Sequence, residues 1–282
     1  MKKFVIYTNP HKDIGGELAE RIRRYLVSCD CEAQTTVMAG EGQDAPRIAE
    51  DAECILVLGG DGTMLHAACD QKQLQIPMIG VNLGTLGYMT EIEPAALEKS
   101  LDLLIRDEYE TESRMMLSGT VLKGEKQEVI SEDEALNDIV IARSGPLQIL
   151  NFDILVNGQF LNRYSADGVI VTTPTGSTGY SLSAGGPIVE PKAKLIMITP
   201  ICSHALNQRS IVLAAEDEIE IVIPESRSGR KQHVEATFDG NHVVSMDTGD
   251  SIKIRKSEKT TDIIKLSKVS FLEILRKKMS ES

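Results

Sequence analysis

The chain has 282 residues, of which 41% are hydrophobic and 26% charged, values typical of a globular protein with one or two domains. Its formal net charge of −12 and its aromatic content of 4%, with no Trp, argue against a nucleic-acid surface, an anionic-membrane surface and a base-stacking platform. An anionic ligand would need local partners: backbone amides, helix ends or a metal ion.

The N-terminus and the cysteines together predict a cytoplasmic protein. The apolar run in MKKFVIYTNP is too short for a signal peptide, and no segment approaches the length of a membrane span. The five cysteines are odd in number and scattered, which favours reduced thiols. Together with the acidic net charge, these features lead us to expect neither a membrane nor a nucleic acid among the partners.

Residues 1–108 alternate apolar strands with amphipathic helices. We expect strands at KFVIYT, ECILVLG and IPMIGVNLG, and helices at GELAERIRRYLVSC, TMLHAACDQ and PAALEKSLDLLIRD. Thr63 is the expected N-cap of the second helix. Strands that alternate with helices predict parallel pairing and a Rossmann-like α/β domain.

Residues 109–267 have a different pattern, with short runs rich in Val, Ile and Thr that turn residues separate. These runs are SGTVLK, DIVIAR, FDILVN, GVIVTT, LIMITP, IEIVIP and IKIRK. They predict a mostly β, sandwich-like domain. The tail VSFLEILRKKM predicts a final amphipathic helix in 268–282 that packs back on the first domain.

The segment ILVLGGDGTML, residues 55–65, is a glycine turn between a strand and a helix. Gly59 and Gly60 leave room for a phosphate to approach the amides, and the helix points its positive end at the same place. The turn lacks the Lys-Ser/Thr of a P-loop and the third glycine of a dinucleotide fingerprint. In the simplest interpretation Asp61 only caps the helix.

A phosphate bound at this turn would change the role expected for Asp61. A carboxylate ~4 Å from a phosphate charge costs about 4 kcal/mol at an effective dielectric constant of ~20. Such a residue is expected to hold a cation or to take a proton from the group that attacks the phosphate. Both roles belong to kinases.

A second constellation begins at Asn137 and Asp138, an amide and a carboxylate at the start of a probable strand. The pair could bind an adenine edge and a ribose diol, although a turn cap explains it equally well. Residues 167–189, DGVIVTTPTGSTGYSLSAGGPIV, follow with small hydroxyl side chains that suit a sugar-and-diphosphate ligand. A loop without a ligand is less favoured, because its backbone needs partners.

These motifs resemble those of the bacterial NAD kinase family. GGDGT, ALND, DGVIVTTPTGSTGYSLSAGGPIV and TPICSHALNQRSIV occur in the family's order and approximate spacing, over most of the chain. The glycine turn alone also resembles turns of phosphofructokinases and diacylglycerol-type lipid kinases, so the long second segment makes the resemblance specific. It implies an ATP-dependent kinase that transfers the γ-phosphoryl group to the 2′-hydroxyl of the adenosine ribose of NAD and makes NADP.

The resemblance also implies the site residues, the cofactor and the assembly. It assigns Asp61 as the catalytic base, with a divalent cation, Mg²⁺, arriving with ATP rather than in a protein metal site. It implies a homodimer or homotetramer in which a neighbouring β domain helps to complete the dinucleotide pocket. The implied NAD and nucleotide contacts are Gly60, Asp61, Gly62, Thr63, His66, Asn137, Asp138, Ser165, Asp167, Thr178, Gly179, Tyr180, Ser181, Ser183 and Asn241.

Four of these positions depart from the commonest family pattern. Asp138 stands where glutamate is frequent, Gly179 where alanine is usual, Ser165 where many relatives have a basic side chain, and Asn241 where glutamine is common. None of these differences removes the implied base. They leave open the preference between NAD and NADH. For His66, phosphate binding and simple helix packing are equally compatible with the sequence.

Two other functions remain compatible with the sequence. Another kinase with a GGDGT turn could act on a lipid or a different small molecule, but the polar Ser/Thr-rich segment argues against an apolar substrate groove. A non-catalytic sensor could bind the dinucleotide without transferring phosphate, and the intact Asp61 argues against that reading.

Overall fold

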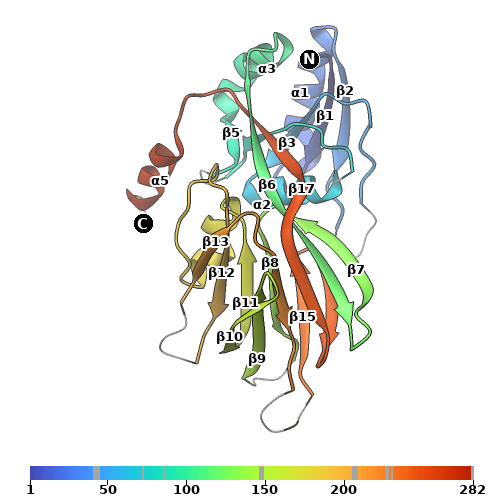
Figure 1. Ribbon diagram of the computed structural model, residues 1–282. Coiled ribbons are helices and arrows are strands. Elements are labelled where there is room, and N and C mark those ends of the chain that lie inside the picture. Colours follow the sequence, from blue (N-terminus) through green and yellow to red (C-terminus); the bar gives the residue numbers. More distant parts are fainter. Residues whose placement is uncertain are drawn as a thin grey trace. The chain divides into compact units, whose positions relative to one another are not determined.

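The computed structural model divides into two compact units (Figure 1). The first comprises Met1–Arg114 and Thr261–Ser282, and the second Met115–Thr260. Two long strands carry the chain from one unit into the other: β6 (Glu110–Lys123) and β17 (Ser251–Lys265). The structure describes residues 1–40, 45–71, 73–84, 87–145, 149–204, 209–225, 229 and 231–280.

The first unit is built on parallel strands in the order β5-β4-β3-β1-β2, with the end of β17 also parallel to β4. The strands are β1 (Lys3–Thr8), β2 (Glu32–Val37), β3 (Cys54–Gly59), β4 (Met78–Asn82) and β5 (Thr90–Ile92). The connecting helices are α1 (Glu17–Ser28), α2 (Asp61–Asp70) and α3 (Leu97–Ile105). The predicted α/β architecture is confirmed.

Burial explains why these segments form these elements. All six residues of β3 are buried, as expected for a central parallel strand that is covered on both faces. In α1, Ile22 and Leu26 are fully buried and Leu18 packs against the same core, so the helical periodicity in the sequence identified the inward face.

The start of α2 differs from the sequence prediction. The helix begins at Asp61 after the extended Gly60 (φ −120°, ψ −166°), so the prediction of Thr63 as N-cap is wrong. Thr63 lies inside the first turn, and its hydroxyl oxygen accepts a hydrogen bond from Asn9 Nδ2 at 3.2 Å. Its side chain therefore faces the loop after β1, because a tertiary partner is available there.

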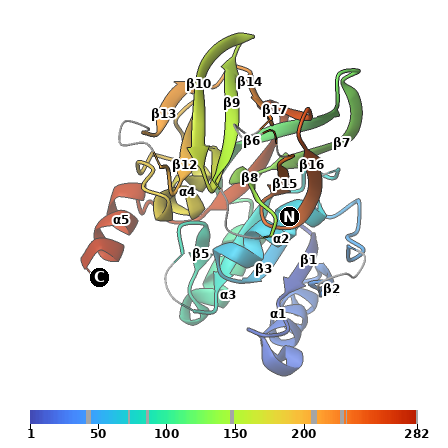
Figure 2. The same ribbon diagram turned by 90° about the horizontal axis from the view of Figure 1, so that it is seen from below.

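The second unit is a sandwich of two antiparallel layers around one apolar core. One layer has the order β13-β12-β11-β8-β15-β16, and the other contains β10-β9-β14-β17 with β6 and β7 (Figure 2). The strands are β7 (Glu128–Ala135), β8 (Asp138–Arg143), β9 (Leu150–Val156), β10 (Gln159–Ala166), β11 (Gly168–Thr172), β12 (Leu195–Ile201), β13 (Ile211–Ala214), β14 (Ile219–Val222), β15 (His233–Phe238) and β16 (His242–Asp247).

The final helix α5 (Phe271–Ser280) belongs to the first unit, as the sequence predicted. The Phe271 ring lies 5.9 Å from the Tyr88 ring, centroid to centroid. Glu91 of β5 holds the chain before the helix: it pairs with Lys265 and accepts hydrogen bonds from the amides of Leu266 and Ser267. Among the described residues, no helix is long and apolar enough to cross a membrane.

Two phenylalanines in the hairpin of β9 and β10 test the sandwich core. Phe152 is fully buried, whereas Phe160 is 62% exposed. We expect Phe152→Ala to lower the free energy of unfolding by about 3–5 kcal/mol, because the truncation leaves a cavity among core side chains. Phe160→Ala is the matched control and should change it by less than about 0.5 kcal/mol. Urea unfolding of both variants measures the difference, and equal losses would contradict the burial pattern.

Candidate active site

The glycine turn between β3 and α2 contains one glycine required for packing and one that leaves space open. A Cβ added to Gly59 would overlap the side chain of Thr63. A Cβ added to Gly60 would meet no atom within 4 Å, so the backbone there is open to a ligand. The amino end of α2 follows directly, and its first amides have no partner within the helix.

Asp61 is not a helix cap. Its Oδ2 accepts the Tyr88 amide at 2.8 Å and its Oδ1 accepts the Met89 amide at 2.9 Å. Gly87 makes this contact possible, because a Cβ at that position would overlap the Asp61 carboxylate. An ionised carboxylate has about four acceptor positions, so each oxygen keeps capacity for a further hydrogen bond. The carboxylate is thus oriented and still able to accept a proton or a ligand group.

Asp61 lines a cavity of about 190 Å³ whose lining also includes two lysines. Lys12 lies in the loop after β1, and Lys278 lies in α5. The Lys278 ammonium lies 4.6 Å from the centre of the Tyr88 ring. The described lining of the cavity is Lys12, Gly60, Asp61, Leu83, Gly84, Gly87 and Lys278.

A buried arginine adds a further positive charge near Asp61. Arg114 is 4% exposed and pairs with Glu112 at 3.0 Å, while its Nε has no hydrogen-bond partner among the described residues. Burial lowers the pKa of Arg114, and attraction to Glu112 and Asp61 opposes that effect. No motif in the sequence marked Lys12, Lys278 or Arg114, since each lies far from the turn along the chain.

The other residues expected near the turn lie on α2. Gly62 is exposed and Thr63 is buried, with its hydroxyl bonded to Asn9. His66 is half-buried and lies one helical turn after Gly62. A phosphate contact by His66 stays a prediction.

In the second unit, the side chain of Asp239 fixes the backbone of the Asn-Asp pair. Its carboxylate accepts the amides of Leu136 at 2.7 Å, Asn137 at 2.8 Å and Asp138 at 3.1 Å. Asp239 occupies a hairpin turn with Gly240, and both have positive φ (48° and 73°), which matches a type I′ turn. The local sequence FDGN is typical of a hairpin turn, but it does not indicate this role of its aspartate.

The Ser/Thr/Gly segment meets the Asn-Asp pair directly. The Asn137 carbonyl accepts the Thr173 amide at 2.9 Å and the Thr172 hydroxyl at 2.8 Å. Gly176 lies against the same carbonyl so closely that a Cβ would overlap it, and a Cβ on Gly179 would stand 3.5 Å from Asn137 Nδ2. Two motifs that are separate in the sequence therefore form one surface in this unit.

Two polar atoms of this surface are buried without hydrogen-bond partners among the described residues. They are Asn137 Oδ1 and Thr175 Oγ1. Buried polar atoms in folded proteins nearly always have partners, so an orphan needs an explanation. A ligand that donates hydrogen bonds to the pair would supply one.

Asp138 is a buried carboxyl group beside these atoms, with a relative exposure of 7%. Burial and the negative charge of Asp239 together raise its pKa to about 7. The group therefore changes charge near neutral pH, unlike an exposed aspartate. Hydroxyl groups of a sugar could satisfy its charged form at this depth.

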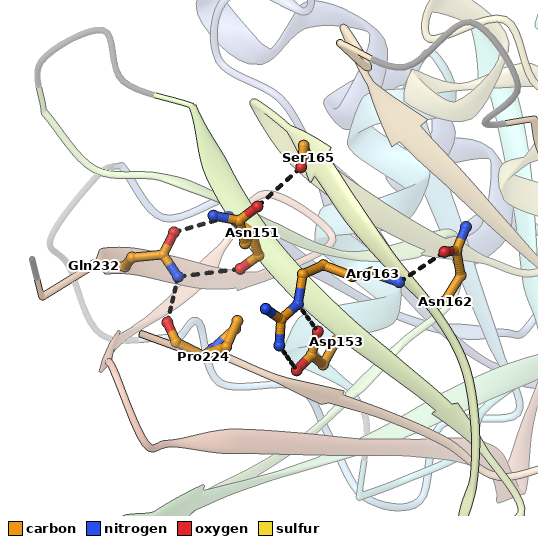
Figure 3. A network of polar contacts seen from close by, with 7 residues as sticks. All are labelled: Asn151, Asp153, Asn162, Arg163, Ser165, Pro224 and Gln232. Carbon is orange, nitrogen blue, oxygen red and sulfur yellow. Dashed lines mark hydrogen bonds and ion pairs between the residues drawn. The ribbon is translucent and has the colours of Figure 1, made fainter. Parts of the chain in front are cut away.

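Several expected contact residues form hydrogen bonds within the protein. Ser165 donates to Asn151 Oδ1 at 2.9 Å, and the backbone amide of Asn151 donates to Gln232 Oε1 at 2.8 Å (Figure 3). The buried Ser181 hydroxyl lies 3.2 Å from the Thr199 hydroxyl. These hydroxyls already have hydrogen-bond partners within the protein, and ligand roles for them stay predictions.

The remaining expected contacts are more accessible. Asp167 lies 3.8 Å from an Arg143 nitrogen, oxygen to nitrogen, and the Tyr180 side chain is 47% exposed. Thr178 is half-buried, whereas Ser183 and Asn241 are exposed. The expected residues thus lie partly in the first unit, around Asp61, and partly in the second.

Comparisons with known proteins identify similar chains over the full length. A family model described as ATP-NAD kinase N-terminal domain matches residues 2–109, and one described as ATP-NAD kinase C-terminal domain matches residues 136–266. An NAD kinase of Lachnospira eligens is 47% identical, covering 99% of this chain and 100% of its own. An NAD kinase of Agathobacter rectalis is 46% identical, covering 99% of each chain.

Solved structures give the same similarity. A yeast NADH kinase complexed with NADH has a TM-score of 0.87 at 25% identity, covering 99% of this chain and 88% of its own. An NAD kinase from Archaeoglobus fulgidus in complex with ATP has a TM-score of 0.76 at 25% identity, covering 99% and 98%.

Adjacent glycines in the turn should respond differently to the same substitution. We expect Gly59→Ala to lower the free energy of unfolding by about 1–3 kcal/mol, because the new methyl group overlaps Thr63. Gly60→Ala should change it by less than about 0.5 kcal/mol, because the methyl enters open space at an extended backbone. Thermal unfolding of both variants tests this, and equal destabilisation would contradict the separation into a packing and an open position.

Asp138 should make the stability of the ligand-free protein depend on pH. Its pKa rises from 3.8 to about 7 on folding, so the folded state binds the proton more tightly. That contribution is fully present below pH 3.8 and is lost as the pH rises through 7. Relative to Asp138→Asn, the wild type should therefore lose up to about 4 kcal/mol between pH 4 and pH 8. Urea unfolding across this range measures it, and parallel profiles would contradict the shift.

Proposed function

Because the chain belongs to the ATP-NAD kinase family, we propose that it transfers the γ-phosphoryl group of ATP to the 2′-hydroxyl of the adenosine ribose of NAD and forms NADP. The family models together match residues 2–109 and 136–266. The observation that carries the residue assignments is the oriented Asp61 carboxylate in a cavity that also contains two lysines.

Asp61 is the proposed general base. It accepts the proton of the 2′-hydroxyl as that oxygen attacks the γ-phosphorus of the donor. The amides of Tyr88 and Met89 hold the carboxylate in one orientation, so little reorganisation is needed when the proton moves. The open backbone of Gly60 and the amino end of α2 bind phosphate oxygens at the same turn, with Gly62, Thr63 and His66 as further candidates.

Asn137 and Asp138 are the proposed partners of the adenosine part. The orphaned Asn137 Oδ1 accepts a hydrogen bond from an adenine amino group, and the Asp138 carboxylate accepts from ribose hydroxyls. Asp239 positions both through their amides. The remaining proposed dinucleotide contacts are Ser165, Asp167, Thr178, Gly179, Tyr180, Ser181, Ser183 and Asn241.

The proposed cofactor is Mg²⁺ that arrives with the nucleotide. Among the described residues, no cluster of three or more His, Cys, Asp or Glu side chains could hold a metal ion. The turn offers only one carboxylate, Asp61, which is too few for a protein metal site and fits an ion whose ligands are phosphate oxygens and waters. Such an ion would offset the charge of the triphosphate.

The assembly and location are further parts of the proposal. The resemblance to bacterial NAD kinases supports a homodimer or homotetramer, and the odd, scattered cysteines support the cytoplasm. Light scattering coupled to gel filtration would measure the oligomer, and a stable monomer would overturn that part. Neither a lipid substrate nor a non-catalytic sensor gains support from the site.

The function is tested by NADP formation from NAD and ATP, with Asp61→Asn as the decisive variant. Removal of the base should lower turnover by about 10²–10⁴-fold, because the hydroxyl must then lose its proton without help. The dissociation constant for NAD should stay close to that of the wild type. Rapid-quench kinetics and isothermal titration calorimetry measure the two effects.

Asp51→Asn is the matched control, because the Asp51 side chain is 69% exposed at the surface of the same unit. Its turnover should equal that of the wild type. Near-normal turnover of Asp61→Asn would remove Asp61 from the chemistry. Failure of the wild type to make NADP, with or without EDTA, would refute the proposed reaction itself.

A further inference from the structure

The cavity at the glycine turn has the opposite charge balance to the rest of the chain. The protein has a formal net charge of −12, yet the described lining of this cavity includes two lysines and a single carboxylate, that of Asp61. A carboxylate alone would repel a triphosphate. We propose that Lys12 and Lys278 form a clamp that binds the phosphate groups of the nucleoside triphosphate donor, an inference that rests on the proposed function.

The clamp supplies what the turn itself lacks. A P-loop carries its phosphate-binding lysine within the motif, whereas GGDGT has none. Here the lysines come from opposite ends of the sequence, and the fold brings both to the cavity that Gly60 and Asp61 line. A lysine acts on phosphate as a mobile point charge. It therefore only has to lie near the phosphate and does not need the fixed fork geometry of an arginine.

Lys12 is fixed relative to the turn by the loop that carries it. The Lys12 amide donates to the Asn9 carbonyl at 2.9 Å, and the Asn9 side chain donates to the Thr63 hydroxyl at 3.2 Å. Asp13 holds the other side of the loop by accepting the amides of Leu18 and Ala19, both at 3.0 Å. The loop thus contacts α2 on one side and the start of α1 on the other.

Lys278 is held at the cavity by Tyr88, the residue whose amide also orients Asp61. The ammonium lies 4.6 Å from the centre of the Tyr88 ring, and Phe271 of the same helix lies against that ring. Glu91, two residues beyond Met89, anchors the chain before α5 through Lys265. The position of the C-terminal helix is therefore linked to the position of the proposed base.

The neighbouring Lys277 provides a matched control. Both lysines lie in the last turn of α5, but Lys277 is exposed and does not line the cavity, whereas Lys278 is half-buried and does. A general effect of positive charge on the helix would involve both side chains equally. The proposed clamp, in contrast, involves Lys278 and not Lys277.

The test compares Lys12→Met, Lys278→Met and Lys277→Met, since methionine keeps the unbranched side chain and removes the charge. Calorimetry with inorganic tripolyphosphate measures anion binding, and steady-state kinetics measures KM for ATP with Mg²⁺ and for NAD. We expect the first two variants to raise the tripolyphosphate Kd and the ATP KM about tenfold or more. The NAD KM and all constants of Lys277→Met should match the wild type.

Lys278→Arg separates the charge from the packing on Tyr88. It keeps the cation and should retain tripolyphosphate binding within about threefold of the wild type, because guanidinium also binds phosphate and aromatic faces. Loss of binding in both Lys278→Met and Lys278→Arg, with an equal loss of thermal stability, would make the residue structural and overturn the clamp.

The outcomes also separate the clamp from the proposed function. Unchanged donor constants in Lys12→Met and Lys278→Met, while the wild type makes NADP, would overturn the clamp and leave the function standing. Equal weakening by Lys277→Met and Lys278→Met would also overturn it. Lysine-dependent binding of tripolyphosphate in a wild type that makes no NADP would support the clamp and refute the function.

Discussion

The contact between the Asp61 carboxylate and the amides of Tyr88 and Met89 determines the arrangement around the glycine turn. It joins the start of α2 to the segment that leads into β5, and Tyr88 in turn carries the ring against which Phe271 and Lys278 lie. A proposed catalytic group and a proposed phosphate ligand thus depend on one short segment. Gly87 is required there because no side chain fits beside the carboxylate.

In the second unit, too, a carboxylate that accepts backbone amides fixes the neighbouring residues. Asp239 accepts three consecutive backbone amides and so fixes Asn137 and Asp138 at the start of β8. The arrangement is unfavourable for Asp138, because it buries that carboxyl group near a second negative charge and raises its pKa to about 7. The orphaned oxygen of Asn137 adds a second unfavourable feature. A buried carboxyl group and an unpartnered polar oxygen at a fixed surface are expected where a ligand supplies the missing partners.

Local charge decides what an acidic protein can bind. The overall charge of −12 disfavours polyanions such as nucleic acids, which contact large areas. A triphosphate contacts a small volume, and a few cations and amides in a cavity of about 190 Å³ dominate the potential that it meets. Lys12 and Lys278 line the same cavity as Asp61, and Arg114 lies near enough to attract its carboxylate, so positive charges offset the negative charge of Asp61.

The sequence determined the glycine turn, the two-part architecture, the family and many of the elements, because strand and helix periodicity and short motifs depend on neighbouring residues. It did not predict the strands β2, β5, β7, β10, β13, β15 and β16. It left open whether Asp61 caps its helix, and it misplaced the N-cap at Thr63. Both depend on partners far along the chain: the amides that bind Asp61 are 27 and 28 residues away. No local pattern marked the roles of Lys12, Lys278 and Asp239, since a charged side chain acquires its role only from what packing places beside it. Only the tertiary structure could decide these roles, because they arise from contacts between segments that no local pattern encodes.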